Sequence, residues 1–420
     1  MFERKVQAIV DGLDFDLPFR VVLPSGHVAS YRDGPPAFTI VFKTPRSLRD
    51  CLFRSTLGFG EAFVRGEIDV EGPLEHVVRL GFAIERQRIP LPLVEKLRYA
   101  AGLLARRNTL AGSRRNIAAH YDLSNEFYQL WLDDNMQYTC AYFRSEDDTL
   151  EAAQLQKMDL VCRKLRLEPG ELVIEAGCGW GGLALHMVRK YGVRVRAYNI
   201  SKEQIAFARE RQRHHGISED RLQYVLDDYR TIPRHATTCD KFVSICMIEH
   251  VGRDSYDTFH RIVADVLKPK GLALIQFISR MRPARFANPW LEKHVFPGYY
   301  NPSLVEFISA LEDDRRPLHV IDVENLRFHY ALTVKHWLRR LEANRANVLK
   351  LYGEARGAEI MRRFRLYLSG GYADFSNGMG TLVYQLLLSN GGNNSLPLTR
   401  DHLVGTETWP RLVEVRSATG

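Results

Sequence analysis

Four glycines that follow a short apolar run constrain this chain more than any other feature of its sequence. Residues 172–176 read Leu-Val-Ile-Glu-Ala, and the next six are Gly-Cys-Gly-Trp-Gly-Gly. The apolar run predicts a buried strand, and glycines let the backbone turn sharply and approach a ligand closely. A helical pattern follows over residues 183–190. We therefore expect a strand–turn–helix unit whose turn lies at the carboxyl edge of a sheet and can hold a cofactor.

The residues around this turn alternate apolar runs with helical patterns. Between about 165 and 280, further strands are expected at 193–198, 222–226, 241–247 and 271–277, with helices between most of them. Strands that are separated by helices form parallel sheets covered on both faces. The fold class predicted from this rhythm is α/β, with a Rossmann-like and mostly parallel sheet.

The chain is expected to have three parts. Residues 1–105 begin with short strands and turns and predict a smaller amino-terminal α+β domain with an accessory role. Residues 106–390 carry the glycine turn and form the larger domain. Residues 391–420 are rich in Gly, Asn, Ser and Thr, and we expect a loosely ordered tail there.

A basic amphipathic helix is predicted at residues 91–115. Its apolar positions recur at helical spacing, and six lysines and arginines accompany them. Such a helix can lie on an anionic membrane or pack its apolar side on a neighbouring domain. Both interpretations stay open at the level of the sequence.

Composition narrows the choice of partners. The chain has 420 residues, 45% of them hydrophobic and 26% charged, which is ordinary for globular proteins, and its net charge is +8. A basic balance favours nucleic acid or a phospholipid surface, or it only makes the surface soluble. Because the sequence has no RNA-binding signature and no basic–aromatic interleaving, we expect no nucleic-acid partner.

The sequence also bears on location and metals. The first seven residues, Met-Phe-Glu-Arg-Lys-Val-Gln, carry charges and lack the apolar core of a signal peptide. No uncharged apolar run approaches the roughly 20 residues of a membrane-spanning helix. Six cysteines are scattered without a CxxC pair, so neither a disulfide framework nor a zinc site is expected. We expect a cytoplasmic protein that binds no metal and contacts a membrane only at its surface.

The glycine turn itself distinguishes between classes of cofactor. Gly177, Gly179 and Gly182 satisfy the GxGxxG pattern of dinucleotide-binding proteins, which is weak evidence alone. Glu175 before the first glycine produces the ExGxG arrangement typical of class I methyltransferases. This residue favours S-adenosylmethionine over a nicotinamide cofactor.

The ends of the following strands supply further candidates for cofactor binding. The second strand leads to Asn199, and Gln204 lies one turn into the next helix. Their amides can supply the hydrogen bonds that an acidic residue commonly makes to ribose hydroxyls. Asp228 and Tyr229 follow the third strand and are expected to border the adenine. Each of these groups can equally be a satisfied polar residue of a loop.

Several stretches together resemble the cyclopropane fatty acid synthase family, which includes the mycolic acid cyclopropane synthases. They are Asn-Ile-Ala-Ala-His-Tyr-Asp-Leu-Ser-Asn at 116–125, Met-Gln-Tyr-Thr-Cys-Ala-Tyr-Phe at 136–143, Glu-Ala-Gly-Cys-Gly-Trp-Gly-Gly at 175–182 and Met-Ile-Glu-His-Val-Gly at 247–252. The resemblance runs from about Leu57 to Leu388. It implies the class I methyltransferase fold, S-adenosylmethionine as cofactor, and transfer of a methylene group to the double bond of unsaturated phospholipid acyl chains.

The amino-terminal part of the resemblance bears on the substrate. Residues 57–72 resemble the amino-terminal domain of the full-length phospholipid enzymes, which the shorter mycolic enzymes lack. The resemblance therefore implies phospholipid chains in place of carrier-bound mycolates. It also implies peripheral contact with an anionic inner membrane, and a homodimer is kept as one expected assembly.

The resemblance assigns roles to individual residues. Cys140, Glu249 and Tyr330 match family residues that hold a bicarbonate, and Ile278 matches one that contributes its backbone. In the family this bicarbonate removes a proton before the ring closes. Two further residues match positions that contact S-adenosylmethionine, namely Tyr138 and Thr139.

One departure from the family pattern concerns the base. Cyclopropane synthases typically carry His-Thr-Ile where this chain has Gln-Phe-Ile, so Gln276 replaces a histidine. A glutamine amide can donate a hydrogen bond but cannot become cationic. The bicarbonate is then held more weakly, or the proton is lost elsewhere.

Three rival functions remain after these observations. Glutamine at position 276 resembles relatives that methylate or methylenate oleoyl chains, as in tuberculostearic acid synthesis. A small-molecule N-methyltransferase shares the motif set, although a soluble amine needs neither the segment at 57–72 nor the basic helix. A non-enzymatic lipid- or nucleic-acid-binding protein is the third class, which the basic charge permits.

Overall fold

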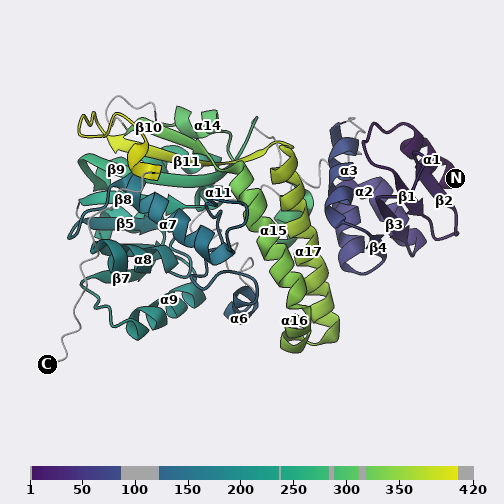
Figure 1. The fold of residues 1–420 in the computed structure, drawn as a ribbon, viewed down its shortest axis with the longest axis horizontal. Helices are drawn as coiled ribbons and strands as arrows, with labels where there is room; N and C mark the ends of the chain where they lie inside the picture. The colour runs from purple at the N-terminus through teal and green to yellow at the C-terminus, as the bar shows by residue number, and fades with distance from the viewer. Residues whose placement is uncertain (1, 87–122, 236–237, 283–287, 312–317, 405–420) are drawn as a thin grey trace. The chain divides into compact units, whose positions relative to one another are not determined.

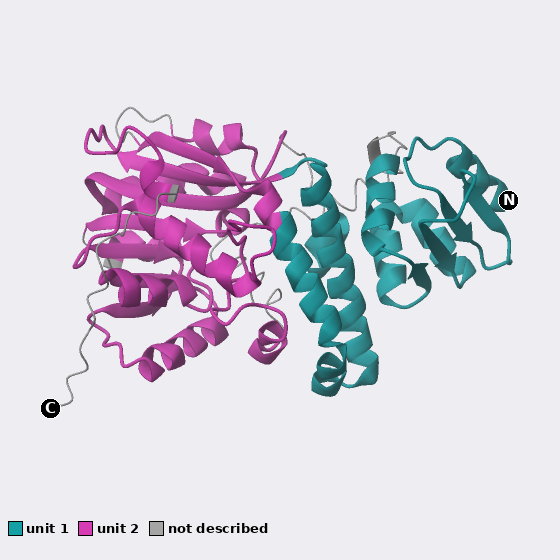
Figure 2. Ribbon diagram, in the orientation of Figure 1, with its two compact units in different colours: residues 1–107, 285–298, 331–381 teal, residues 108–284, 299–330, 382–420 magenta. Residues whose placement is uncertain are grey.

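The computed structural model describes residues 2–86, 123–235, 238–282, 288–311 and 318–404 (Figure 1). The chain forms two compact units (Figure 2). Unit 1 comprises residues 1–107, 285–298 and 331–381, and unit 2 comprises residues 108–284, 299–330 and 382–420. The expected boundary near residue 105 and the expected basic helix at 91–115 lie outside the described residues, so both stay predictions.

Unit 2 contains a seven-stranded sheet in the order β10-β11-β9-β8-β5-β6-β7. The pairs β5–β6, β6–β7, β5–β8 and β8–β9 are parallel, and β10 pairs with β11 in the antiparallel direction. This arrangement confirms the predicted α/β fold with a mostly parallel sheet. The strands are β5 (Leu172–Ala176), β6 (Arg194–Asn199), β7 (Leu222–Leu226), β8 (Cys239–Ile245), β9 (Leu267–Arg280), β10 (Leu318–Asn325) and β11 (Thr381–Asn390).

Helices cover both faces of this sheet. Val173 of β5 packs in a cluster with residues of α7, α8 and α9, whereas its neighbour Ile174 packs in a second cluster with residues of α12 and α14. Because successive side chains of a strand point to opposite faces, the two clusters fill the two sides of one sheet. The helices of this unit include α6 (Asn125–Gln129), α7 (Leu150–Leu165), α8 (Gly182–Tyr191), α9 (Lys202–His214), α10 (Ile232–His235), α11 (Ile248–Val251), α12 (Tyr256–Val266), α14 (Leu304–Ser309) and α18 (Asp401–Val404).

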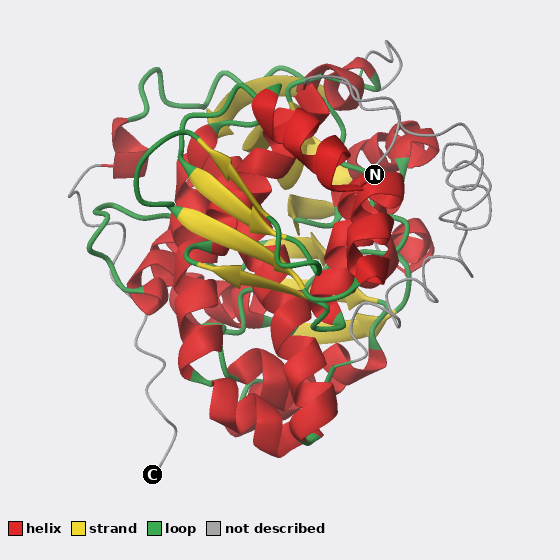
Figure 3. Cartoon of the chain, turned by 90° about the vertical axis from the view of Figure 1, so that its right-hand side faces the viewer, coloured by secondary structure: helices red, strands yellow, loops and turns green. Residues whose placement is uncertain are grey.

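Unit 1 is built on a four-stranded sheet in the order β2-β1-β3-β4, whose strands lie side by side in Figure 3. Its strands are β1 (Phe19–Val22), β2 (Val28–Tyr31), β3 (Phe38–Phe42) and β4 (Ile68–Glu71). Helices contribute the rest, which confirms a smaller α+β domain at the amino terminus. They are α1 (Phe2–Asp11), α2 (Pro45–Val64), α3 (Leu74–Arg86), α13 (Pro289–His294), most of α15 (Arg327–Ala343), α16 (Arg345–Tyr352) and α17 (Glu354–Asn377).

Late segments of the chain belong to unit 1, which the sequence did not indicate. Helix α17 contacts α2 and α3, and its Arg362 donates hydrogen bonds to the carbonyls of Phe63 and Ile68 at 3.0 and 3.1 Å. The same guanidinium pairs with Asp69. An arginine that satisfies carbonyls at the end of a helix and at a strand ties distant segments together.

The described part of the tail also makes specific contacts. Arg166 donates a hydrogen bond to the carbonyl of Ser395 at 2.7 Å, and Asn393 donates one to the carbonyl of Lys270 at 2.8 Å. Arg400 pairs with Asp322 of β10. Residues up to 404 are therefore held against unit 2. Among the described helices, none is both long and apolar enough to cross a membrane.

A pair of glycine substitutions tests the packing of unit 1. A Cβ at Gly60 of α2 lies 2.3 Å from Cδ1 of the Trp290 indole, whereas a Cβ at Gly81 of α3 meets nothing within 4 Å. We expect Gly60→Ala to destabilise the protein by about 1–3 kcal/mol through overpacking. Gly81→Ala is expected to be neutral or stabilising by up to about 1 kcal/mol, because alanine is the better helix former. Thermal unfolding of the full chain measures both, and a wild-type melting temperature for Gly60→Ala contradicts the packing.

Candidate active site

The glycine turn after β5 has a left-handed backbone. Gly177, Gly179 and Gly181 have φ values of +83°, +53° and +78°, a region that side chains of L residues rarely adopt. The amides of Gly177 and Cys178 donate hydrogen bonds to the carbonyl of Tyr198 at 2.9 and 3.1 Å. The turn is therefore fixed against the end of β6.

The four glycines are needed for different reasons. A Cβ at Gly181 lies 2.3 Å from the Tyr224 hydroxyl, and one at Gly182 lies 2.3 Å from the carbonyl oxygen of Asn135. A Cβ at Gly177 lies 3.0 Å from Met247, whereas one at Gly179 meets nothing within 4 Å. Packing inside the protein thus excludes side chains at positions 181 and 182. At position 179 the space is open.

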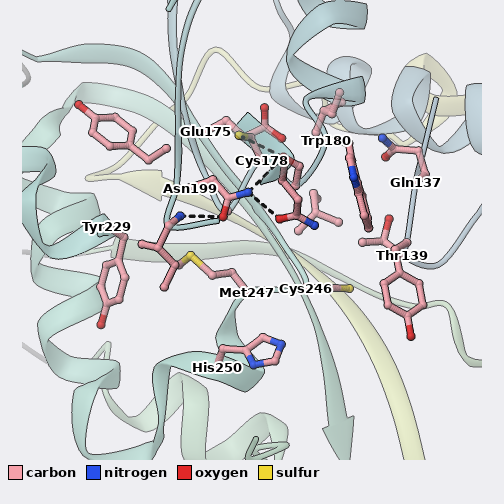
Figure 4. A pocket seen from close by; sticks show the side chains of 18 of the residues that line it. Gln137, Thr139, Glu175, Cys178, Trp180, Asn199, Tyr229, Cys246, Met247 and His250 are labelled. Carbon is pink, nitrogen blue, oxygen red and sulfur yellow. Dashed lines mark hydrogen bonds between the residues drawn. The ribbon is translucent and has the colours of Figure 1, made fainter. Parts of the chain in front are cut away.

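All nine residues that the sequence predicted for cofactor binding line one pocket at the carboxyl ends of β5, β6, β7 and β8 (Figure 4). In this view Gln137, Thr139 and Trp180 lie on one side of the pocket, and Tyr229 lies on the other. The predicted residues are Tyr138, Thr139, Glu175, Gly177, Gly179, Asn199, Gln204, Asp228 and Tyr229.

Asn199 and Gln204, both predicted to bind ribose hydroxyls, have different roles in the structure. The Asn199 amide donates to the carbonyl of Gly179 at 3.1 Å and to Oε1 of Gln204 at 2.8 Å. Its oxygen accepts from the amide of Ile200 at 2.8 Å. The Nε2 of Gln204 is buried and has no hydrogen-bond partner among the described residues. Asn199 therefore holds the turn and orients Gln204, which presents the available donor.

Asp228 borders the pocket with its carboxylate already paired. Nε and Nη2 of Arg230 donate to the two carboxylate oxygens at 2.7 and 2.8 Å, and the Arg230 amide donates to Oδ1 at 3.0 Å. Tyr229 packs edge-on against Phe259. Asp228 thus fixes the local backbone through Arg230, and Tyr229 forms part of the pocket wall.

The segment that carries Tyr138 and Thr139 is held from behind by α7. The buried Gln154 donates from Nε2 to the carbonyl of Thr139 at 2.9 Å. One turn later, the buried Lys157 donates from Nζ to Oε1 of Gln137 at 2.5 Å and to Oγ1 of Thr139 at 3.0 Å. Sequence reasoning missed Lys157, because nothing in the helical pattern of α7 distinguishes it from a solvated lysine.

Buried charges surround the turn. Burial raises the pKa of Glu175 to about 8, although the nearby Lys157 cation acts to lower it. Burial lowers the pKa of Lys157, whereas the charge of Asp133 acts to raise it. Oε2 of Glu175 is buried without a hydrogen-bond partner among the described residues. A cationic ligand beside Glu175 would favour the ionised form of its carboxyl group.

Glu249 lies on α11, between Met247 and His250, which line the pocket. Its Oε1 accepts a hydrogen bond from the Ile278 amide at 2.5 Å. Its Oε2 is buried and has no partner among the described residues. Burial raises the pKa of Glu249 to about 7. The carboxyl group can therefore gain or lose a proton near neutral pH.

The structure brings Cys140 and Tyr330 to a common point. The Cys140 thiol lies 3.7 Å from the carbonyl oxygen of Leu326, which also accepts a hydrogen bond from the Tyr330 amide at 3.0 Å. The Cys140 amide interacts with the sulfur of Cys246, which lines the pocket. Glu249 acts electrostatically on the same sulfur. Cys140 therefore lies beside Cys246, which lines the pocket, and the charge of Glu249 acts on the same thiol.

Gln276 is buried in a chain of polar side chains. Its Nε2 lies 3.5 Å from the sulfur of Cys246, and its Oε1 accepts from Gln385 at 2.8 Å. Gln385 accepts from Lys164 at 2.8 Å, and Lys164 pairs with Glu324 at 2.5 Å. The amide expected to face an anion is thus engaged at both ends by protein groups.

Other pocket residues escaped sequence reasoning. Cys246 has a left-handed backbone with φ +53°, which no local pattern announced, and Trp180 donates from its indole to Asn125 at 2.7 Å. Met247 and Gln137 stand inside quoted family stretches, so the resemblance could have identified them. None of the five predicted catalytic residues lines the pocket itself. Cys140 and Gln276 contact Cys246, which lines it, and Glu249 lies between two lining residues of its own chain segment.

Comparison with known proteins places the chain in a family. A family model described as mycolic acid cyclopropane synthetase matches residues 109–386, and a domain of unknown function matches residues 12–88. A probable fatty acid methyltransferase from Pseudomonas putida is 34% identical, over 92% of this chain and 96% of its own length. The cyclopropane-fatty-acyl-phospholipid synthase of Escherichia coli K12 is 33% identical, over 88% of this chain and 92% of its own length.

A solved structure shows the same fold. Mycolic acid cyclopropane synthase CmaA1, complexed with SAH and CTAB, is 30% identical and has a TM-score of 0.59, covering 66% of this chain and 98% of its own. The sheet of unit 2 is therefore that of the class I S-adenosylmethionine-dependent methyltransferases, as expected. The family model spans well over half of the sequence, and the two relatives align over most of it. The chain belongs to the mycolic acid cyclopropane synthetase family.

Proposed function

We propose that this chain transfers a methylene group from S-adenosylmethionine to the double bond of unsaturated phospholipid acyl chains and forms cyclopropane fatty acids. One observation carries the proposal. The nine predicted cofactor residues line a single pocket, and Glu249, between two lining residues, is buried with one oxygen that has no partner in the described part of the chain. The relatives named above act on fatty acyl chains according to their names.

The residues around the pocket fit the cofactor. When bound, S-adenosylmethionine supplies an electrophilic methyl group on a cationic sulfur. Gln204 offers an amide donor that has no partner among the described residues and suits a ribose hydroxyl. Glu175 is a buried carboxyl group whose ionised form a cationic ligand would favour. Gly179 leaves open space where a side chain would project.

The residues beside the pocket suit a reaction that must exclude water. An alkene is a poor nucleophile, and water would capture the positive charge that develops on it. Cys140, Glu249 and Tyr330 are 0%, 4% and 5% exposed, so this side of the site is dry. Oε2 of Glu249 is the acceptor that would take a hydrogen bond from the hydroxyl of a bicarbonate; such an anion would supply a base.

Methylation or methylenation of the same chains is the second candidate. It is favoured by the position of Gln276, whose amide binds Cys246 and Gln385. It is also favoured by the Ile278 amide, which donates to Glu249 itself. These contacts leave fewer hydrogen-bond donors for a bicarbonate. Because the bicarbonate would remove the proton before the ring closes, ring closure is the step that these residues support least. The name of the Pseudomonas putida relative, a probable fatty acid methyltransferase, points the same way.

The place of action follows from the substrate. A phospholipid chain is reached at a membrane surface, and a net charge of +8 attracts the chain to anionic lipid. We propose peripheral contact with the cytoplasmic side of an anionic inner membrane. A homodimer and the lack of a nucleic-acid partner stay predictions.

Turnover on vesicles tests the function. Purified full-length protein is incubated with labelled S-adenosylmethionine and oleoyl-phosphatidylglycerol vesicles, and the lipids are analysed by mass spectrometry and NMR. We expect label in the acyl chains and the proton signals of a cyclopropane ring. A methylene or unsaturated methyl product has the same mass as the ring and is recognised by the absence of ring protons; a saturated methyl branch, heavier by two hydrogens, would need a hydride donor added to the assay. If no label enters the lipid, the proposal is wrong, and a small-molecule methyltransferase becomes the better hypothesis.

The pH dependence of turnover tests Glu249. Its carboxyl group, with a pKa of about 7, is increasingly protonated as the pH falls through 7, and a protonated Oε2 would no longer accept a hydrogen bond from the hydroxyl of a bicarbonate. At saturating S-adenosylmethionine, we expect kcat to fall to half near pH 7 and to continue falling at lower pH. Glu249→Gln is expected to lower kcat by about 100-fold or more, with little change in cofactor affinity. A Glu249→Gln enzyme with near-normal kcat excludes the assigned role.

Two valine substitutions separate backbone strain from loss of the cofactor. Gly179 and Gly170 both have positive φ values, +53° and +86°, and a Cβ at either meets nothing within 4 Å. Only Gly179 lines the pocket. We expect Gly179→Val to abolish binding of S-adenosylmethionine in calorimetry, because the side chain takes the cofactor's space. Gly170→Val is expected to bear similar strain and bind normally. Equal affinities in the two variants would show that position 179 does not touch the cofactor.

A further inference from the structure

Lys157 is a charged side chain with no exposed surface, placed directly behind the pocket. Its relative exposure is 0%, and it donates to Gln137 and Thr139, both of which line the pocket. Burial of an ammonium group is costly unless it is paired and hydrogen-bonded. Asp133, itself 2% exposed, supplies opposing charge. The hydrogen bonds of this buried lysine therefore orient the side chains of Gln137 and Thr139.

The direction of its hydrogen bonds determines what the pocket wall offers. An ammonium group has only donors, so the oxygens of Thr139 and Gln137 that contact it must accept. A hydroxyl that accepts from an ammonium keeps its own O–H as a donor for another partner. The Gln137 amide is likewise oriented with its oxygen toward Lys157, while its Nε2 donates to the carbonyl of Asn135 at 3.3 Å and keeps a second N–H. Lys157 therefore leaves the Thr139 hydroxyl and the second N–H of Gln137 as donors for another partner.

The neighbourhood of this wall supports the same polarity. A Cβ at Gly182 would lie 2.4 Å from Nε2 of Gln137, so the absence of a side chain there makes room for the amide. Gly182 is the first residue of α8, and the amino terminus of a helix carries partial positive charge. Gln154 fixes the backbone of the same segment through the Thr139 carbonyl. The donors are thus held in place by two side chains of α7.

We propose that Lys157 is a positioning residue that sets the hydrogen-bonding polarity of this wall, so that Thr139 and Gln137 bind a carboxylate, and that this carboxylate belongs to the methionine part of S-adenosylmethionine. The inference rests on the proposed function and deepens it. Lys157 does not touch the ligand; it acts through the two side chains that it orients. A bicarbonate has the same chemistry, but Thr139 and Gln137 lie on the cofactor pocket, whereas the residues expected for bicarbonate do not.

Calorimetry with two ligands tests the proposal. S-adenosylmethionine and its decarboxylated form, which lacks only the carboxylate, are titrated into wild-type protein, Lys157→Met and Thr139→Val in bicarbonate-free buffer. The wild type is expected to bind S-adenosylmethionine more tightly than the decarboxylated ligand. In Lys157→Met we expect affinity for S-adenosylmethionine to fall about 10- to 100-fold, the scale of a charge-assisted hydrogen bond. Affinity for the decarboxylated ligand should change less than about threefold, since it makes no carboxylate contact.

The other variants separate polarity from charge and from folding. Thr139→Val keeps the lysine charge but removes one donor, and we expect it to lose part of the same preference. Lys164→Met removes another buried lysine of α7, which binds Glu324 and Gln385, and is expected to lower the melting temperature without changing the ligand preference.

Four outcomes would count against the proposal. A Lys157→Met protein that keeps the preference overturns it, and so does a Thr139→Val protein with the full preference, because the effect would then be one of charge alone. A change that appears only as altered bicarbonate dependence of turnover also overturns it. A wild-type protein that binds neither ligand overturns the proposed function itself.

Discussion

The hydrogen bond from the Asn199 amide to the carbonyl of Gly179 holds the site together. It joins the turn after β5 to the end of β6, and the same amide orients Gln204. A turn with three left-handed glycines has little conformational preference of its own. Without this contact the backbone would lose the geometry that leaves position 179 open and presents the Gln204 donor.

Near this turn the protein buries ionisable groups whose hydrogen-bonding atoms are not all satisfied. Lys157 donates hydrogen bonds to Gln137 and Thr139, yet Glu175 and Glu249 each keep one buried oxygen without a partner among the described residues. Burying polar groups without partners costs stability, so such groups persist where a ligand or a proton supplies the missing partner. The two carboxyl groups differ in place: Glu175 lies near the end of β5, just before the turn, and Glu249 lies on α11.

The glycine pattern and the strand–helix rhythm were sufficient to predict the mostly parallel sheet and seven of the nine pocket residues, whereas Tyr138 and Thr139 came from the resemblance to the family. Both depend on local properties, because glycine conformation and apolar periodicity are visible within a few residues. Two features were beyond such reasoning. Arg362 joins α17 to segments almost 300 positions earlier, and Gln276 binds Gln385, which is more than 100 positions away. No local pattern encodes a contact between such distant residues.

The sequence by itself determined the fold class, the turn and the family, because these follow from local periodicity and from motifs of fixed spacing. Only the tertiary structure decided which polar groups are already satisfied. Asn199 and Asp228 are engaged by neighbours, whereas Gln204 and Glu249 keep an atom for a ligand. It also revealed Lys157 behind the wall. The physical reason is that hydrogen-bond partners and burial arise when strands and helices from separate parts of the chain pack together. Neither can be predicted from the residues that are adjacent in sequence.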